Sequence, residues 1–279
     1  MNVVMDRPLV SLRRRVLASM VVILLGAVGC RGGFNYVEPS AGRAAGQGTV
    51  VECAEKRPLR VVTYNIAFAR HLDSAIQVLA HEPGLRDADI MLLQEMTAES
   101  TARVAQSFGL HYVYYPAIHH RRSGQDFGNA VLSRCPIVAD SRVILPHRSR
   151  YAGTQRIATH ARIMIADLAL QVYSTHLGTV ADISGRQRRE QLLTIVADAD
   201  RSSHVIIGGD MNTSDLGWIT ELPSFQWATA SNPRTTTFGR WDHLLLRGLS
   251  LTSDSATGVV AAGRRASDHA AVWALVRLH

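Results

Sequence analysis

Residues 154–176 read TQRIATHARIMIADLALQVYSTH, and this stretch decides the fold class. It holds two strand candidates, Thr154–Ala166 and Leu168–His176, which are rich in apolar and β-branched residues. Only a short turn separates them, and a turn of that length joins antiparallel strands. The stretch therefore predicts a β-hairpin near the middle of the chain.

The chain before this hairpin begins with a different pattern. Strand and helix candidates alternate over Leu59–Ile66, His71–His81, Ala88–Gln94 and Thr97–Phe108. This alternation alone would predict a doubly wound parallel sheet. Further strand candidates then follow closely at 128–133 and 137–145, and that spacing is typical of antiparallel hairpins.

The chain after the hairpin adds one helix and several strands. The helix candidate is Ser184–Asp200, and the strand candidates are His204–Gly209, Trp241–Leu246, Leu249–Ser253 and Ala270–Leu278. Because strands outnumber helices, we expect an α/β fold of two mixed, mostly antiparallel sheets. The sheets would pack face to face, with a few helices covering each from outside.

Length and composition limit the classes of protein to consider. The chain has 279 residues, 47% of them hydrophobic and 19% charged, so we expect one catalytic-sized domain and exclude a disordered, collagen-like or coiled-coil chain. The formal net charge is +7, and Lys56 is the single lysine. Arginine suits phosphate contacts, but a net charge of this size bears only on the rate of association with anionic ligands.

The N-terminus has the pattern of an export signal. Arg13–Arg15 precede the apolar run Val16–Gly29, which is too short to span a bilayer comfortably and leads into Cys30. Ala27–Cys30 resembles a bacterial lipobox, whose cysteine becomes the lipidated first residue. We expect a signal peptide over 1–30, a flexible tether over 31–57 and one domain over 58–279, held at the periplasmic or cell-surface side of a membrane through Cys30. A plain secreted protein and an uncleaved anchor are the alternatives.

The two remaining cysteines leave a disulfide open. Export would place Cys53 and Cys135 in an oxidising compartment, where they could pair. Their spacing does not require it, and we expect two unpaired thiols. Neither cysteine stands in a motif with a partner base, so a thiol nucleophile is not expected.

Polar residues that can bind metal or move protons stand at the ends of the apolar strand candidates. They are Asn65, Glu95, His176, Asp210, Asn212, Asp242, Asp268 and His269. Taken singly, most have a structural explanation: a turn for Asn65, charge at a helix N-terminus for Glu95, and a satisfied core position for His176. Asp210 and Asn212 are harder to explain in this way, because they fall on one side of an extended segment after two glycines.

The order of these residues resembles that of the endonuclease/exonuclease/phosphatase superfamily of divalent-metal phosphoesterases. The matching motifs run through the whole domain and are Thr63-Tyr64-Asn65, Gln94-Glu95, Gly128–Ser133, Thr175-His176-Leu177, Gly209–Asn212, Trp241-Asp242 and Ser267-Asp268-His269. The resemblance implies a four-layer α/β/β/α sandwich, which agrees with the strand pattern.

The resemblance also implies a metal site and a phosphate site. Glu95, Asn65 and Asp268 would hold Mg²⁺, with Mn²⁺ as the second choice. His176 and Asn212 would hold phosphate oxygens.

The remaining implied roles concern proton transfer and the rim of the site. Asp210 would orient or deprotonate the attacking water, and His269 would pair with Asp242; which of Asp210 and His269 is the base stays open. Asn129 and Arg156 fall where family members brace the rim, and we expect structural roles for both.

We therefore expect hydrolysis of a phosphate ester, most simply a phosphodiester, by in-line attack of an activated water. The candidate substrates are a lipid headgroup, a small phosphodiester or nucleic acid, and a monomer is expected. The segment 116–127 is expected to be a loop with few bulky side chains that could wedge into DNA. Nucleases that grip duplex DNA need longer basic loops, and we see none in this sequence. A nuclease acting outside the cytoplasm is one alternative, and a catalytically silent tethered binding module is the other.

Overall fold

The computed structural model describes residues 33–49, 53, 57–121, 123–222 and 224–279. The expected signal peptide and Cys30 lie outside the described residues. Residues 33–279 form one compact unit. Among the helices described, none is long and apolar enough to cross a membrane.

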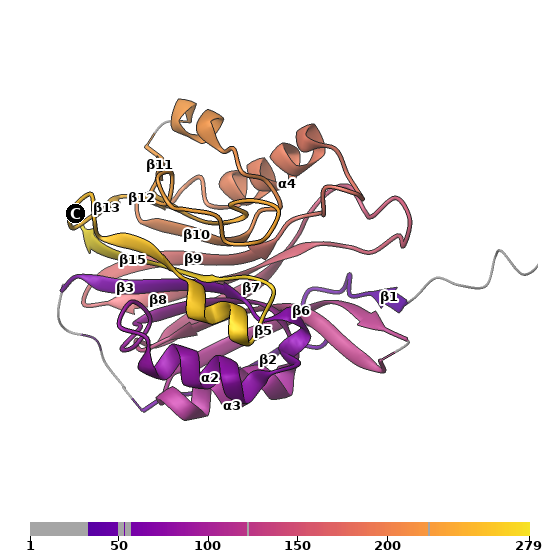
Figure 1. Cartoon of the computed structure of the whole chain (residues 1–279), viewed down its shortest axis with the longest axis horizontal. Helices are drawn as coiled ribbons and strands as arrows, with labels where there is room; N and C mark the ends of the chain where they lie inside the picture. Colours follow the sequence, from indigo (N-terminus) through magenta and orange to yellow (C-terminus); the bar gives the residue numbers. More distant parts are fainter. Residues whose placement is uncertain (1–32, 50–52, 54–56, 122, 223) are drawn as a thin grey trace, which may run out of the picture. The chain divides into compact units, whose positions relative to one another are not determined.

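The first sheet runs in the order β1–β5–β6–β4–β3–β15–β13 (Figure 1). The short strand β2 also pairs with β5, and β14 also pairs with β15. β3 and β4 are parallel, and the other pairs are antiparallel. The strands are β1 Gly33–Asn35, β2 Ala44–Gly46, β3 Leu59–Asn65, β4 Ile90–Met96, β5 His111–His120, β6 Gln125–Ser133, β13 Leu249–Leu251, β14 Thr257–Val260 and β15 Ala271–Leu278.

The second sheet runs in the order β11–β12–β10–β9–β8–β7. β9 and β10 are parallel, and the remaining pairs are antiparallel, including the β8–β9 hairpin that the sequence predicts. The strands are β7 Ile137–Ile144, β8 Ile157–Ile165, β9 Leu168–His176, β10 Val205–Asp210, β11 Gln226–Trp227 and β12 Asp242–Arg247.

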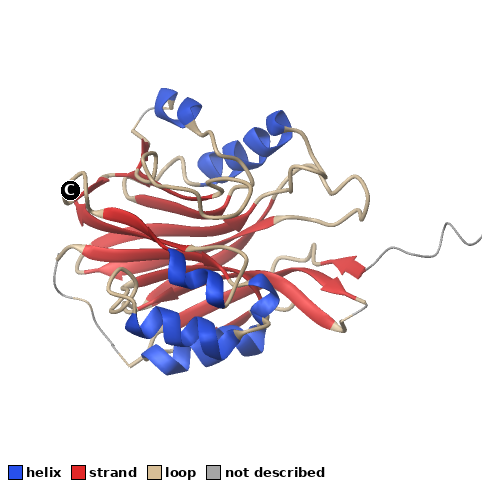
Figure 2. Cartoon of the chain, in the orientation of Figure 1, coloured by secondary structure: helices blue, strands red, loops and turns tan. Residues whose placement is uncertain are grey.

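Helices cover the outer face of each sheet, so the order of layers is α/β/β/α (Figure 2). The α-helices are α2 Leu72–His81 and α3 Ala98–Phe108 on the first sheet and α4 Gly185–Asp198 on the second. Three short 3₁₀ helices complete the described elements: η1 Ala67–Ala69, η2 Gly217–Glu221 and η3 Ala261–Arg265. The predicted four-layer sandwich of two mixed, mostly antiparallel sheets is confirmed.

The strand sequences explain why each sheet is buried on both faces. Successive side chains of a strand point to opposite faces, so a continuous apolar run supplies two cores. Leu92 packs into the core between the sheets, and its neighbour Leu93 packs into the core beneath α2 and α3. In the second sheet Ile206 faces the first sheet, whereas Ile207 belongs to the core beneath α4.

Helix α3 begins and ends where the sequence predicts. The Thr97 hydroxyl accepts a hydrogen bond from the Ser100 N–H at 3.1 Å, and the Ser100 hydroxyl accepts from the Thr97 N–H at 2.9 Å. Gly109 ends the helix with φ +64°, a left-handed conformation that glycine adopts without strain.

The expected flexible tether over 31–57 is wrong for its described part. β1 and β2 both pair with β5, and the Thr49 N–H donates to the Gly109 carbonyl at 3.0 Å. Two strands of three residues each carry no detectable periodicity, and sequence patterns therefore missed them.

The expected loop over 116–127 is also wrong, because most of it belongs to the hairpin of β5 and β6. Pro116 lacks an N–H and argues against a strand, yet it lies at a bulge where the β5–β6 register shifts between Pro116 and Ile118. Gly128 opposite admits this bulge, since a Cβ there would lie 2.0 Å from the Tyr115 carbonyl oxygen.

Cys53 and Cys135 form a disulfide, which corrects the expectation of two unpaired thiols. Their Cα atoms lie 5.5 Å apart although 82 residues separate them in sequence. Spacing alone could not predict this contact, because Cys53 lies in a segment that was expected to be a tether.

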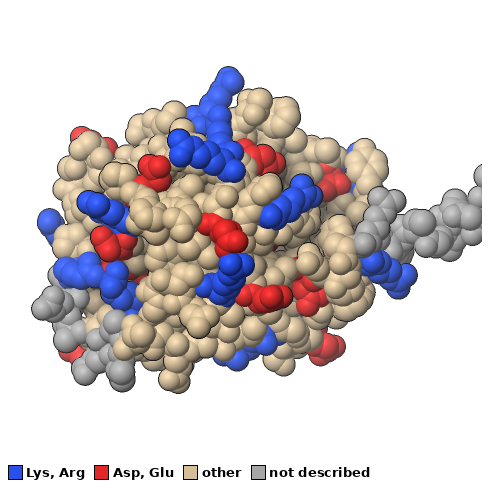
Figure 3. All heavy atoms as spheres, turned by 60° about the horizontal axis from the view of Figure 1, so that its bottom comes forward, with Lys and Arg blue, Asp and Glu red and all other residues tan. Residues whose placement is uncertain are grey.

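Charge is mixed on the face that carries α2 and α3. Figure 3 shows arginine side chains interspersed with aspartate and glutamate on this face. The positive charge on this face is therefore offset by neighbouring acidic groups and is not gathered into one patch.

Candidate active site

Strand register brings three candidate residues together in the second sheet. His176 ends β9, Asp210 ends β10 and Asp242 begins β12. Asp210 pairs in register with His176 on one side and with Asp242 on the other. Gly209 permits this tight approach, because its φ is +148° and a Cβ there would lie 1.8 Å from the Thr175 carbonyl oxygen.

The first sheet places Asn65 and Glu95 at the same rim. Asn65 ends β3 and pairs in register with Gln94 of the parallel strand β4. Glu95 follows at a β-bulge between Gln94 and Met96 and has φ +60°. A left-handed backbone is costly for a glutamate, and such positions concentrate at functional sites. The bulge directs the Glu95 side chain toward the second sheet.

Asn65 connects the candidate residues of the first sheet with those of the second. Its Nδ2 donates to Glu95 Oε1 and to Asp210 Oδ2, both at 3.2 Å, while its Oδ1 accepts from the Ala67 N–H at 3.0 Å. His176 approaches the same carboxylates, with Nε2 3.3 Å from Asp210 Oδ2 and Nδ1 3.8 Å from Glu95 Oε1. Residues from both sheets therefore meet at one end of the sandwich.

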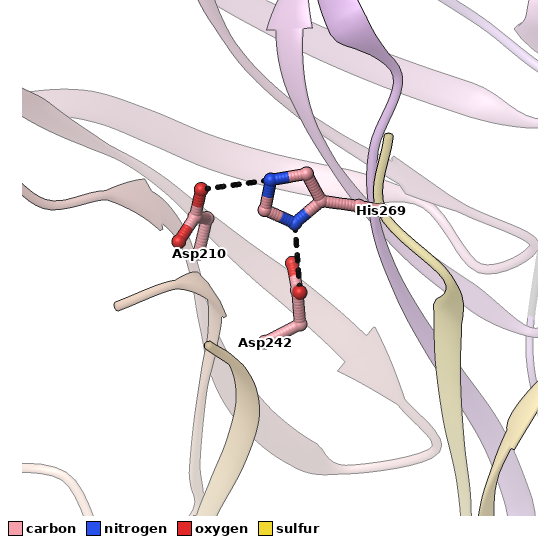
Figure 4. Close-up of side chains that lie close together, drawn as sticks. All are labelled: Asp210, Asp242 and His269. Atoms are coloured by element: carbon pink, nitrogen blue, oxygen red, sulfur yellow. Dashed lines mark hydrogen bonds and ion pairs between the residues drawn. The ribbon is translucent and has the colours of Figure 1, made fainter. Parts of the chain in front are cut away.

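His269 enters this centre from the turn before β15. The Ser267 hydroxyl donates to the Asn65 carbonyl at 2.6 Å and accepts from the His269 N–H at 3.1 Å, which anchors the turn. His269 Nδ1 lies 2.8 Å from Asp242 Oδ2, and its Nε2 lies 3.6 Å from Asp210 Oδ2 (Figure 4). The imidazole thus stands between two carboxylates.

Burial and mutual charge give these groups unusual pKa values. Burial, with the charge of Asp242, raises the pKa of Asp210 to about 7. Burial lowers the pKa of His269, but the charge and hydrogen bond of Asp242 outweigh it and raise that pKa to about 10. Burial, then the charges of Arg156 and His269, hold the pKa of His176 well below its usual range. At neutral pH His269 is therefore cationic and His176 neutral.

Two places in the site offer ligands to a metal ion. Ligand atoms of Asp210, Asp242 and His269 lie within 4.8 Å of one another. Glu95 and the exposed Asp268 line one pocket of about 440 Å³. The site therefore contains a group that could hold a metal, and a second pair of carboxylates beside it.

The chemistry of the Glu95 position suits a hard cation better than that of the Asp210, Asp242 and His269 group. Burial raises the pKa of Glu95, the Asn65 amide and the Arg156 charge oppose this, and Asp268 raises the pKa further. A divalent cation would neutralise this partly buried carboxylate, and carboxylate oxygens are the ligands that Mg²⁺ prefers. His269 Nδ1 and Asp242 Oδ2, by contrast, already engage each other at 2.8 Å.

Asn212 lies beside Asp210 in a left-handed conformation with φ +49°. Its N–H donates to Asp210 Oδ1 at 2.9 Å, and its Nδ2 donates to the Leu177 carbonyl at 3.1 Å. One amide proton is therefore committed to the backbone, and the second remains for a ligand.

The two rim residues have different surroundings. Asn129 is buried and links the sheets, since its Nδ2 donates to the Ile157 carbonyl at 2.9 Å and its carbonyl accepts from the Thr159 hydroxyl at 2.9 Å. Arg156 instead faces the centre, where its charge lowers the pKa of Glu95 and of His176. These hydrogen bonds agree with the structural role expected for Asn129, whereas Arg156 differs in placing its charge near Glu95 and His176.

Sequence reasoning did not assign the polar link beneath the site. Gln94 Nε2 donates to the Ser174 hydroxyl at 3.1 Å, and that hydroxyl donates to the Leu93 carbonyl at 3.2 Å. Gln94 and Ser174 are fully buried, so this link fixes the distance between the sheets directly below Glu95 and His176. A glutamine inside an otherwise apolar strand was the available signal.

Aromatic side chains at the rim were also missed. Phe68 is 39% exposed and lies in η1, where three successive residues, Ala67–Ala69, have positive φ. Its ring centroid is 4.9 Å from that of Phe127, which is 6.0 Å from His176. Phe68 also lines the pocket of Glu95 and Asp268.

A family model described as "Endonuclease/Exonuclease/phosphatase family" matches residues 62–269. No curated protein matches the chain.

Three solved structures illustrate the likeness of fold. An endonuclease/exonuclease/phosphatase from Bacteroides vulgatus has TM-score 0.63 and 16% identity over 80% of this chain and 100% of its own. D. rerio TDP2 complexed with single strand DNA product has TM-score 0.62 and 14% identity, over 79% of this chain and 99% of its own. A mannosyl-6-phosphatase of Bacteroides thetaiotaomicron has TM-score 0.57 and 16% identity, over 79% and 99%. At these identities the likeness establishes the fold.

Proposed function

The chain belongs to the endonuclease/exonuclease/phosphatase family, and on that premise we propose that it hydrolyses a phosphodiester with the help of a divalent metal ion. Nucleases and phosphatases both hydrolyse phosphate esters, which sets the reaction type. One observation carries the proposal: Asn65 Nδ2 donates at 3.2 Å to both Glu95 and Asp210, so the metal-binding and proton-transfer groups share one centre.

The proton-transfer roles follow from the pKa directions. Asp210, with a pKa of about 7, is ionised in a large share of molecules at neutral pH and can take a proton from the attacking water. His269, with a pKa of about 10, keeps its proton and presents a cation beside the same carboxylate. We therefore assign the base to Asp210, and to His269 the stabilisation of charge on the phosphate.

The phosphate would lie between His269, Asn212 and His176. His269 would donate from Nε2, Asn212 from its remaining amide proton, and neutral His176 from whichever ring nitrogen carries hydrogen. His176 Nδ1 is buried and has no hydrogen-bond partner among the described residues, which supports a ligand-facing role.

Glu95, with Asp268 across the pocket and Asn65 beside it, would hold the metal. Its chemistry there would be Lewis-acid neutralisation of the charge that gathers on the phosphate oxygens. The carboxylate oxygens of Glu95 and Asp268 favour Mg²⁺ over softer metals, with Mn²⁺ as the second choice. Asn65 would support Glu95 through its Nδ2, because its Oδ1 accepts from the Ala67 N–H.

The substrate is open within this reaction type. A lipid headgroup, a small phosphodiester and nucleic acid all present a diester. The structurally similar proteins do not choose among them, since one is TDP2 with a single-strand DNA product and another is a mannosyl-6-phosphatase. A nuclease acting on single strands is the second candidate, because Phe68 is exposed beside Glu95 and the Arg70 guanidinium lies 5.0 Å from its ring centroid. Stacked aromatic and arginine groups are typical of single-strand binding.

A substrate panel tests the proposal. Bis-(p-nitrophenyl) phosphate, single-stranded oligonucleotide, supercoiled plasmid and sphingomyelin vesicles would each be supplied with Mg²⁺ or Mn²⁺, and we expect the first to be hydrolysed. The member with the highest kcat/KM then identifies the substrate class. A protein that binds phosphate yet hydrolyses no member with either metal would instead be a binding module.

We further propose that the domain works outside the cytoplasm, tethered through lipidated Cys30, and acts as a monomer. The export pattern of residues 1–30 supports the location. The Cys53–Cys135 disulfide is consistent with it, since disulfides persist in oxidising compartments.

A further inference from the structure

The N-terminal strap, which we define as residues 33–49, crosses from one sheet to the other. β1 and β2 pair with β5 of the first sheet. On the other side, Arg43 forms a bidentate ion pair with Asp140 of β7, with both distances 2.6 Å. The strap lies outside residues 62–269, so its contacts are a feature of this chain beyond the family match.

Asn35 is the strap residue that touches the turn leading into the active site. Its Nδ2 donates to the Gly153 carbonyl at 3.0 Å, and its Oδ1 accepts from the Gln155 N–H at 2.8 Å. The side-chain amide thus holds backbone groups on both sides of Thr154. The next residue after Gln155 is Arg156, one step before β8 begins.

Arg156 is a cation that lacks a fixed partner of its own. Among the described residues its guanidinium makes no hydrogen bond or ion pair, and its Cζ lies 5.9 Å from the Phe127 ring centroid. It is half-buried, and its charge lowers the pKa of Glu95 and of His176. An arginine with free donors beside a phosphate site is suited to bind a phosphate oxygen.

We propose that Asn35 is a positioning residue, which holds the 153–155 backbone so that Arg156 can donate to the substrate phosphate. This rests on the proposed function, because it places the phosphate next to Glu95 and His176. Arg156 is then a catalytic residue, and Asn35 acts only through it.

The construction of the turn explains why an outside residue is needed. The turn between β7 and β8 spans residues 145–156, and its own bonds include Ser149 N–H to the Thr154 carbonyl at 2.9 Å. The Ser149 bond fixes its tip and the Leu145 N–H to Arg156 carbonyl bond, at 3.0 Å, closes its base. Neither engages the Gly153 carbonyl or the Gln155 N–H, which bind Asn35. Without the amide, both backbone groups lose their partner and the direction of the Arg156 backbone is less constrained.

A double-mutant cycle tests this coupling in the full domain. We would measure the affinity for inorganic phosphate in the presence of Mg²⁺, and kcat/KM for bis-(p-nitrophenyl) phosphate, in the wild type, Asn35→Ala, Arg156→Ala and the double variant. Each single change should weaken both quantities by about tenfold, as expected for coupled contacts. The double variant should be no weaker than Arg156→Ala within a factor of about two, because Asn35 acts through Arg156.

Thr49→Ala is the matched control within the strap. It removes the hydrogen bond from the Thr49 hydroxyl to the Gly109 carbonyl, which lies away from the turn, and should leave phosphate affinity at the wild-type level. If Asn35→Ala does not fold, Asn35→Asp replaces it in the cycle, because it removes the donor to Gly153 while keeping an acceptor for Gln155.

The outcomes separate this inference from the proposed function. The positioning role would be overturned if the fold-losses of the two single variants multiplied in the double variant. It would also be overturned if Asn35→Ala bound phosphate as tightly as the wild type. A wild type that does not bind phosphate would overturn it as well. Non-additive losses of phosphate affinity in a protein that hydrolyses no ester would support the positioning role while refuting the proposed hydrolysis.

Discussion

His269 Nδ1 and Asp242 Oδ2 lie 2.8 Å apart, and both residues are buried. The other carboxylate oxygen of Asp242 has no hydrogen-bond partner among the described residues. The negative charge of Asp242 therefore holds the proton of His269 and fixes the orientation of its ring toward Asp210, and it also raises the pKa of Asp210. A neutral partner in place of Asp242 would weaken both effects.

The pH dependence of hydrolysis should report this arrangement. Asp210 works as a base when deprotonated, above a pKa of about 7, and His269 works when protonated, below a pKa of about 10. The value of kcat/KM should therefore rise through the lower pKa and fall through the upper one. Asp242→Asn removes a negative charge that raises both pKa values, so both limbs should move to lower pH. The control is Asp254→Asn, which removes a charge from an exposed residue; equal profiles for the two variants would contradict the assignment.

Metal dependence should localise to Glu95. EDTA should abolish hydrolysis, and Mg²⁺ should restore it. Glu95→Gln removes a carboxylate ligand, so the Mg²⁺ concentration for half-maximal rate should rise by at least about tenfold. Glu99→Gln, in the exposed first turn of α3, is the matched control and should behave as the wild type. A larger shift for Asp242→Asn than for Glu95→Gln would place the metal in the Asp210, Asp242 and His269 group instead.

Reduction of the disulfide should destabilise the domain. Cross-links across long loops typically contribute about 2–4 kcal/mol, and this one joins residues 82 apart. The free energy of unfolding, from urea titration with and without dithiothreitol, should fall by about that amount in the reduced protein. Cys135→Ser should show the lower value under both conditions. A wild type whose unfolding midpoint ignores the reductant would mean that the two cysteines do not pair.

Membrane association should depend on Cys30. The wild type expressed at full length should partition with membranes, and Cys30→Ser, which cannot be lipidated, should leave them. Cys135→Ser serves as a cysteine control and should remain membrane-bound. If Cys30→Ser stays with the membrane, the lipobox reading fails and an uncleaved anchor becomes the better interpretation.

The sequence predicted the parts of the molecule that local patterns determine. Helix α3 could be located from Thr97 and Gly109, and the residues Asn65, His176 and Asp210 from the ends of apolar strands. These signals succeed because capping and burial act over a few residues.

The parts of the molecule that long-range contacts determine could not be predicted from the sequence. β1 and β2 exist because β5 offers an edge, and Cys53 meets Cys135 only once the sheets are assembled. The role of Arg156 likewise depends on Asn35, which lies about 120 positions earlier and binds the backbone next to it. Pairings over such separations leave no local pattern to read.

The central claim, that Asp210 activates water at a centre shared with Glu95 and His269, is tested most directly by Asp210→Asn. We predict that this variant hydrolyses bis-(p-nitrophenyl) phosphate at least about 100-fold more slowly than the wild type, since general-base catalysis is worth about 10²–10⁴-fold. The variant should remain folded, as thermal melting would show, because the change keeps an oxygen for the Asn212 N–H and loses only the hydrogen bond from Asn65 Nδ2. Hydrolysis at the wild-type rate by the folded variant would contradict the claim.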